Sequence, residues 1–145
     1  MDIEELLRKD EAVRPTPYLD CCSKGWRECC CEVKGNLTVG VGRNLDAVPF
    51  TDTEISMMLS LDISRAIEAA RSLCSIYDKL SRPRQVVLIS MAFNMGKTKL
   101  AKFVRMWSAI HLEDFETAAD EILDSRAGKK IVKRYERLAE MMRKG

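Results

Sequence analysis

The sequence predicts an α+β fold: a small antiparallel β-sheet lobe near the N-terminus, a long bridging helix, and a mostly helical C-terminal lobe. Residues 18–42 contain short runs of β-favouring residues, separated by the turn signals Ser-Lys-Gly and Lys-Gly-Asn. From Thr51 onward, apolar residues recur at helical spacing in one segment after another. A chain of 145 residues can hold one domain, or two small lobes that share a core.

The N-terminal residues predict a short first helix that reaches at most to about Glu11. Pro15 and Pro17 follow it, and proline cannot continue a helix. The turn signals that come next divide a β lobe of about residues 12–50 into two or three strands. One register places Gly25-Trp26 at a two-residue turn, because glycine suits the first central position of a type II′ turn.

Five of the six cysteines lie in this lobe, at Cys21, Cys22, Cys29, Cys30 and Cys31. The turn at residues 25–26 would set Cys22 opposite Cys29 and Cys21 opposite Cys30. A one-residue slip would pair Cys22 with Cys30 and Cys21 with Cys31 instead. No CxxC pair occurs, so the usual zinc-ribbon signature is absent. Free thiols, cross-strand disulfides and a thiolate metal site all remain open.

A capping box at Thr51-Asp52-Thr53-Glu54 begins the bridging helix, which is predicted over about residues 52–73. Its apolar residues share one face: Ile55, Met58, Leu59, Ile63, Ala66, Ile67 and Ala70.

The helical lobe is predicted over about residues 76–143 and is expected to include the N-terminal helix. Ser81 and Pro83 open a helix that is apolar nearly all round and stops at Gly96, so we expect it to be buried. Because no flexible linker interrupts the chain, residues 1–145 are expected to form a single domain. Three further helices are predicted, over about Lys99–Ile110, Asp114–Asp124 and Lys130–Met142.

Several classes of protein are excluded by what the sequence lacks. No apolar run approaches the roughly 18 residues that span a bilayer. The only histidine, His111, falls at a predicted helix end, which disfavours Ser-His-Asp catalysis. There is no P-loop, and Gly40-Val41-Gly42 lacks the third glycine and the following helix of a dinucleotide site.

Charge is concentrated near the C-terminus. The chain carries a net charge of +2, whereas the segment from Gly128 onward has seven cations and two anions. Such a basic segment suits an anionic partner, such as nucleic acid, acidic lipid or an anionic cell-wall polymer. The other interpretation is a helix with a solvated basic face.

Carboxylates are the remaining candidates for catalysis. Glu11 ends the first predicted helix and Asp20 lies in the first predicted strand, an arrangement that can aim the two across a cleft. Hydrolysis of a glycosidic bond needs such a pair, in which one acid protonates the leaving oxygen and one carboxylate handles water. Spacing alone does not single them out in a chain with 22 acidic residues.

Three groups of motifs resemble those of the phage-type lysozymes, glycoside hydrolase family 24. Glu11, Tyr18-Leu19-Asp20 and Gly35-Asn36-Leu37-Thr38-Val39-Gly40-Val41-Gly42 resemble the family's N-terminal signature. Met91-Ala92-Phe93-Asn94-Met95-Gly96 is similar to its apolar helix with a Phe-polar-apolar-Gly end, and Asp124-Ser125-Arg126 resembles its late Ser-Arg motif. The resemblance covers about residues 1–140 and implies a lysozyme-like fold.

This resemblance implies a muramidase that hydrolyses the β-1,4 bond between N-acetylmuramic acid and N-acetylglucosamine in peptidoglycan, with no cofactor and no metal. Glu11 would be the general acid, and Asp20 and Thr38 would handle the attacking water. That inverting scheme needs the two carboxyl groups roughly 6.5–9.5 Å apart.

The resemblance also implies supporting residues. Asn94 and Arg126 would bind substrate, and Arg134 would pair with Glu11. An ion pair alone would lower the pKa of Glu11, so burial must offset it if Glu11 is to be an acid near neutral pH. From residues alone, Asn94 is equally a helix C-terminal capping residue, and Arg134 a solvated cation.

We expect a monomer that is made in the cytoplasm without a signal peptide and acts on peptidoglycan after release. We expect no nucleic-acid partner and no stable membrane insertion. The chain departs from the family by an insertion after Asp20, by Arg43-Asn44 where His is frequent, and by Ala127 where an aromatic is frequent. Two alternatives remain: a lytic transglycosylase, and a non-catalytic wall- or metal-binding protein that uses the cysteine-rich hairpin.

Overall fold

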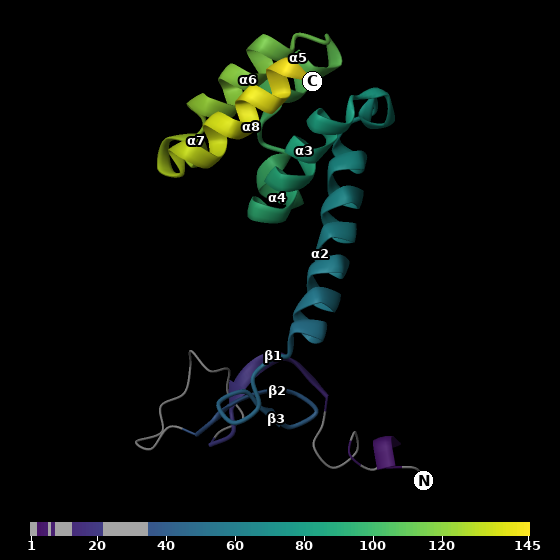
Figure 1. The fold of residues 1–145 in the computed structure, drawn as a ribbon, viewed down its shortest axis with the longest axis vertical. Helices are drawn as coiled ribbons and strands as arrows, with labels where there is room; N and C mark the ends of the chain where they lie inside the picture. The colour runs from purple at the N-terminus through teal and green to yellow at the C-terminus, as the bar shows by residue number, and fades with distance from the viewer. Residues whose placement is uncertain (1–2, 6, 8–12, 22–34) are drawn as a thin grey trace. The chain divides into compact units, whose positions relative to one another are not determined.

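The computed structural model describes residues 3–5, 7, 13–21 and 35–145 (Figure 1). Residues 3–5 and 7 are helical, in agreement with the predicted first helix. Its predicted end near Glu11 and the predicted turn at residues 25–26 lie outside the described residues. The chain divides into two compact units, Met1–Ile55 and Ser56–Gly145.

The first unit contains a three-stranded antiparallel sheet in the order β1-β2-β3, which confirms the predicted small sheet. Its strands are β1 (Arg14–Leu19), β2 (Leu37–Gly40) and β3 (Arg43–Asn44). Tyr18 pairs with Thr38 and Leu19 with Leu37, so the end of β1 lies beside the start of β2.

Both prolines of the N-terminal segment lie within β1. They fall between Arg14 and Tyr18, where the register of β1 against β2 shifts. Proline in a sheet is found at edge strands and bulges, and β1 is an edge strand of the described sheet. Between β2 and β3 the chain reverses at Gly40 and Gly42, whose φ angles of 67° and 66° favour glycine.

The bridging helix α2 runs over Asp52–Leu73, as predicted. The capping box forms: the Thr51 hydroxyl accepts from the Glu54 N–H at 3.3 Å, and the Glu54 carboxylate accepts from the Thr51 N–H at 2.8 Å. Within the second unit, the apolar face of α2 is buried at Ala66 and Ala70.

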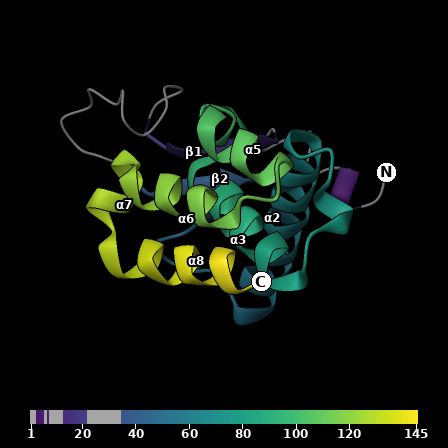
Figure 2. The same ribbon diagram turned by 90° about the horizontal axis from the view of Figure 1, so that it is seen from above.

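The second unit is helical. After the short 3₁₀ helix η1 (Tyr77–Lys79), it contains α3 (Arg82–Met95), α4 (Lys97–Leu100), α5 (Val104–His111), α6 (Phe115–Asp124), α7 (Arg126–Lys130) and α8 (Val132–Lys144). Helices α6 and α8 lie side by side (Figures 1 and 2). Its core includes Leu88, Met91, Met106, Ile122 and Tyr135, all fully buried.

Helix α3 buries Val87, Leu88, Met91 and Ala92, whereas Phe93 at its end is 47% exposed. It ends where predicted: Gly96 has a φ of 78° and its N–H donates to the Ala92 carbonyl.

The predicted single helix over Lys99–Ile110 is wrong, because the chain forms two helices, α4 and α5, separated by residues 101–103. The break is stabilised by Trp107, whose buried indole N–H donates to the Leu100 carbonyl at 3.0 Å. The same carbonyl accepts from the Phe103 N–H at 3.1 Å, so the end of α4 is hydrogen-bonded by both groups. Apolar spacing continues through the break, so periodicity alone did not reveal it.

The helix predicted over about Lys130–Met142 is α8, and the short helix α7 before it was not predicted. Helix α7 precedes it and α8 begins at Val132, after Ile131 leaves the helical conformation. The Ser125 hydroxyl caps α7 by accepting from the Gly128 N–H at 2.9 Å. Gly128, within α7, is buried where a side chain would meet the Ile122 and Leu123 carbonyls.

Candidate functional site

Asp20 is held at the end of β1 by Asn36. The Asn36 N–H donates to Asp20 Oδ1 at 2.8 Å, and the Asn36 side-chain amide donates to Oδ2 at 3.0 Å. A third bond runs from the Asp20 N–H to the Asn36 carbonyl at 3.1 Å. Both carboxylate oxygens are therefore fixed by one residue, while the side chain remains exposed to solvent.

Gly35 is required by the close approach of this carboxylate. A Cβ atom at Gly35 would lie 1.9 Å from Asp20 Oδ1 and 2.5 Å from the backbone nitrogen of Cys21. No side chain fits there without moving Asp20. Gly35 thus leaves the space that the Asp20 carboxylate occupies, and Asn36 donates the hydrogen bonds that hold it.

Thr38 is hydrogen-bonded to the same residue, Asn36. It is 4% exposed, and its hydroxyl donates to the Asn36 carbonyl at 3.1 Å. Because the hydroxyl hydrogen is used in that bond, the oxygen can act toward a neighbouring molecule only as an acceptor. Asp20 and Thr38 share Asn36, so the structure groups these two predicted residues.

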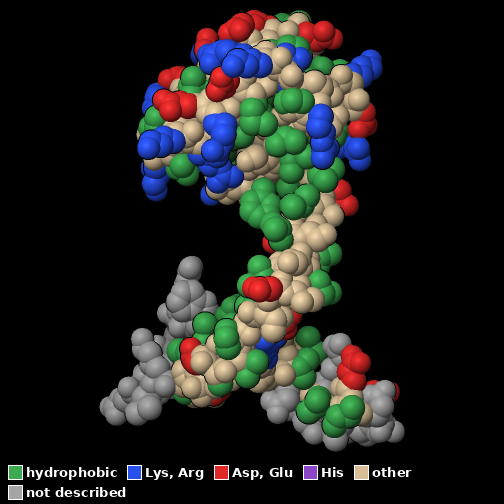
Figure 3. All heavy atoms as spheres, in the orientation of Figure 1, with side chains coloured by type: hydrophobic (Ala, Val, Ile, Leu, Met, Phe, Trp, Pro, Cys, Tyr) green, Lys and Arg blue, Asp and Glu red, His purple; other side chains and the backbone are tan. Residues whose placement is uncertain are grey.

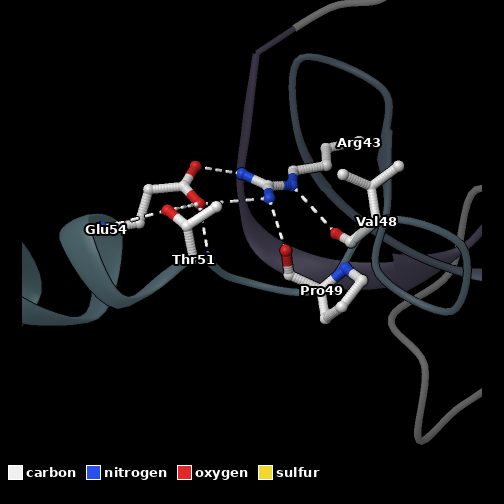
Figure 4. A network of polar contacts seen from close by, with 5 residues as sticks. All are labelled: Arg43, Val48, Pro49, Thr51 and Glu54. Carbon is white, nitrogen blue, oxygen red and sulfur yellow. Dashed lines mark hydrogen bonds and ion pairs between the residues drawn. The ribbon is translucent and has the colours of Figure 1, made fainter.

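Next to Thr38, Arg43 forms the polar network of Figure 4. Its guanidinium donates to the Val48 carbonyl at 3.1 Å and to the Pro49 carbonyl at 2.7 Å. It also forms a two-pronged ion pair with the Glu54 carboxylate. The Thr51 N–H and hydroxyl both donate to that carboxylate at 2.8 Å.

The pKa of Glu54 is lowered to about 2 by this network. The hydrogen bond from Arg43 is the largest cause, followed by the backbone and side-chain bonds from Thr51. Glu54 is therefore ionised at any pH at which a glycosidase would be assayed.

Asn94 and Arg126 line one groove of the second unit, with a volume of about 860 Å³. The groove lies among the end of α3, α4, the start of α5 and α7. Both side chains are exposed. The apolar part of its lining comes from Met95, Phe103, Val104, Ala127 and Ile131.

The charge of this groove is mainly positive. Its two acidic residues are already paired: Glu121 with Arg105 at 3.6 Å, and Asp124 with Lys129 at 2.7 Å. Four cations also line the groove, and none of them makes an ion pair with a residue that the structure describes: Lys99, Lys102, Arg126 and Lys130. Figure 3 shows Lys and Arg side chains gathered on this part of the helical unit.

Arg134 lies on α8 against α3. Its guanidinium donates to the Ser90 hydroxyl at 3.2 Å and reaches the Ser90 carbonyl at 3.5 Å. The side chain is half-buried rather than fully solvated. Its predicted partner, Glu11, lies outside the described residues, so the pair stays a prediction, as does the separation between Glu11 and Asp20.

Of the cysteines that the structure describes, Cys21 is exposed and Cys74 is buried, and burial raises the pKa of the Cys74 thiol. Cys22, Cys29, Cys30 and Cys31 lie outside the described residues, and with them the predicted pairings. Across residues 13–21 and 35–145, no group of three or more His, Cys, Asp or Glu side chains could hold a metal ion. No helix in the described part of the chain is long and apolar enough to cross a membrane.

The protein has the order of elements of a lysozyme-like α+β protein: a small sheet, a long helix and a helical unit. A hydrogen-bonded carboxylate, that of Asp20, lies at the end of the first strand. The family model "Phage lysozyme" matches residues 8–139, so the chain belongs to the phage lysozyme family, and the resemblance seen in the sequence is confirmed. The family indicates a glycosidase-type enzyme.

Two relatives show how far the similarity extends. The chain is 26% identical to the pre-baseplate central spike protein Gp5 of Enterobacteria phage T4, over 81% of this chain and 23% of that protein. It is 23% identical to the probable T4-type lysozyme 2 of Dictyostelium discoideum, over 99% of this chain and 94% of that protein. The chain thus spans about a quarter of the first relative and nearly all of the second.

The residues that hold the carboxylate and the hydroxyl were not predicted from the sequence. Gly35 and Asn36 belong to the family motif, and Arg43 stands where the family frequently has His. A Gly-Asn pair directly before a strand that carries a candidate Thr is the signal that was available. The pairing of Glu54 with Arg43 had no local signal, since the two residues are 11 positions apart.

Proposed function

We propose that the protein is a muramidase that hydrolyses the β-1,4 bond between N-acetylmuramic acid and N-acetylglucosamine in peptidoglycan. The observation that supports this most directly is that one residue, Asn36, is hydrogen-bonded to both Asp20 and Thr38. Membership of the phage lysozyme family supports the class of reaction.

In the proposed reaction, Glu11 gives its proton to the leaving glycosidic oxygen. A water molecule attacks the anomeric carbon from the opposite face, and its proton passes to Asp20. Each Asp20 oxygen accepts one hydrogen bond from Asn36, which leaves lone pairs free to bind and deprotonate water. Thr38 accepts a second hydrogen bond from the same water. The product is the inverted sugar, which requires the two carboxyl groups to be roughly 6.5–9.5 Å apart.

The groove around Asn94 and Arg126 is proposed as the substrate-binding surface of the helical unit. Peptidoglycan carries free carboxylates on its peptides. The four groove cations that make no ion pair with a described residue can bind those carboxylates by charge-assisted hydrogen bonds. The apolar lining suits the methyl groups of N-acetyl and lactyl substituents, and the Asn94 amide suits their carbonyls.

Arg134 is proposed to orient Glu11. Its hydrogen bonds to Ser90 fix the guanidinium on the helical unit. A fixed cation beside Glu11 lowers the pKa of that carboxyl, so Glu11 must also be shielded from water to remain a proton donor.

The test is lysis of chloroform-treated Gram-negative cells, followed as loss of turbidity. Glu11→Gln should abolish lysis because an amide has no carboxylic proton to donate. Glu136→Gln is the matched control, since Glu136 is exposed on α8 and does not line the groove. More than a few per cent of activity in folded Glu11→Gln would refute the assignment.

Mass analysis of the products separates the two possible reactions. Hydrolysis adds one water to each cleaved bond, whereas a lytic transglycosylase leaves an anhydro-muramyl end. Asp20→Asn should abolish the hydrolytic product. Anhydro ends in the wild-type digest would show a transglycosylase instead.

A further inference from the structure

Arg43 contacts the loop that joins the sheet to the first turn of α2. Its guanidinium contacts the loop at the Val48 and Pro49 carbonyls and the helix at Glu54 (Figure 4). The Phe50 ring centroid lies 5.2 Å from the guanidinium carbon, close enough for a cation–π contact. The Arg43 side chain therefore connects β3 to the loop and to the first turn of α2.

The other end of the same loop is tied to the start of β2. The Asp46 carboxylate accepts from the Leu37 N–H at 2.9 Å, and the Leu45 N–H donates to the Leu37 carbonyl at 2.7 Å. The Asn44 side chain accepts from the N–H groups of Asp46 and Ala47. Both backbone groups of Leu37 are thus bonded to the loop.

Leu37 lies between Asn36 and Thr38 in the chain. Asn36 is the residue that holds the Asp20 carboxylate. Arg43 itself is paired with Val39, and Asn44 with Thr38, so β3 also supports Thr38 from the side. A shift of the loop would move Leu37, and with it the carboxylate and the hydroxyl on either side of it.

We propose that Arg43 is a positioning residue for Asp20 and Thr38, acting through residues 44–50 and Leu37. This inference rests on the proposed function. Arginine suits the position because its planar fork serves a carboxylate and two carbonyls at once, whereas the single ammonium group of lysine cannot reach all three. Glu54 and Thr51 complete the arrangement by fixing the carboxylate that Arg43 contacts.

The experiment compares Arg43→Gln, Arg43→Lys and Glu54→Gln with the wild type. The matched control is Arg65→Gln, because Arg65 forms an exposed ion pair with Asp62 at 3.0 Å on α2, outside the network. Three quantities are measured: kcat and KM on soluble peptidoglycan fragments, the melting temperature, and amide hydrogen exchange at Leu37 and Leu45.

Arg43→Gln should lower kcat by about 10- to 100-fold, because misplacing a reacting group by about 1 Å costs that much. KM should change by less than about threefold, since the groove of the helical unit is untouched. Exchange at Leu37 and Leu45 should become about tenfold faster. Arg43→Lys should be intermediate, Glu54→Gln should match Arg43→Gln, and Arg65→Gln should match the wild type.

Faster exchange with an unchanged kcat would overturn the proposal and leave Arg43 a purely structural residue. Unchanged exchange with a lower kcat would overturn the route through Leu37. If Arg43→Gln fails to fold, Arg43→Lys and Glu54→Gln carry the same comparison. An inactive wild type would refute the proposed function instead, and the exchange rates would still show whether Arg43 holds Leu37.

Discussion

Replacing Gly35 by alanine should inactivate the enzyme by displacing Asp20. The added methyl would lie 1.9 Å from Asp20 Oδ1, whereas a carbon–oxygen contact needs about 3.3 Å. The carboxylate must therefore move by about 1.4 Å. Rotation of the side chain does not relieve the second contact, 2.5 Å from the backbone nitrogen of Cys21, so the strand end must shift as well.

A displacement of this size should lower the rate of lysis by about 100-fold, since reacting groups misplaced by 1 Å lose that much. The melting temperature should fall too, because overpacking a close contact costs about 1–3 kcal/mol. Loss of the Asn36 hydrogen bonds adds little to that cost, because the Asp20 side chain is exposed and water can replace them.

Gly40→Ala is the matched control. Gly40 has a φ of 67°, so alanine is strained there by about 1–2 kcal/mol, but its Cβ would meet nothing within 4 Å. Gly40→Ala should therefore lose stability and keep most of its activity. The assay is the initial rate of turbidity loss, measured well below both melting temperatures.

Equal losses for Gly35→Ala and Gly40→Ala, or half of the wild-type activity in folded Gly35→Ala, would refute the reasoning.

Three further outcomes are expected. Arg134→Ala should lower the melting temperature more than Lys144→Ala, because Arg134 is half-buried and hydrogen-bonded to α3, whereas Lys144 pairs with Glu140 on an exposed face; equal shifts would place Arg134 among the solvated cations. The double variant Lys99→Ala/Lys102→Ala should raise KM with little change in kcat and should weaken the salt dependence of KM, and an unchanged KM would remove the groove from substrate binding. Acid denaturation tests Glu54: its pKa is about 2 in the folded state against an ordinary 4.5, so its contribution is present above pH 4.5 and is lost as pH falls toward 2. Glu54→Gln should be less stable than wild type near pH 7 and should converge with it near pH 2, whereas a constant difference would contradict the low pKa.

The sequence predicted the helix boundaries well where a capping or stop signal lies within a few residues of the boundary. The capping box at Thr51 and Glu54 marks the start of α2, and Gly96 marks the end of α3. The errors fall where a tertiary contact overrides periodicity. The break between α4 and α5 depends on the Trp107 indole, which reaches the carbonyl of Leu100. No count of apolar spacing contains that contact.

The sequence named candidate site residues, which stay predictions, but it did not contain the contacts that position them. Asp20 and Thr38 follow from the family motif, whereas the hydrogen bonds that hold them come from Asn36 and from the loop after β3. These bonds join residues 16 and 9 positions apart, so they depend on strand register. A slip of one residue between β1 and β2 would turn Thr38 to the other face of the sheet.

The insertion after Asp20 is compatible with this register. Residues 20–36 separate the two strands in sequence, yet Leu19 pairs with Leu37 and the Asp20 and Asn36 backbones are hydrogen-bonded at 3.1 Å. A longer connection adds closure entropy only slowly, by about 0.6 kcal/mol for each doubling of its length. The three bonds between Asp20 and Asn36 and the space left by Gly35 act at the strand ends, so they do not depend on what the connection contains.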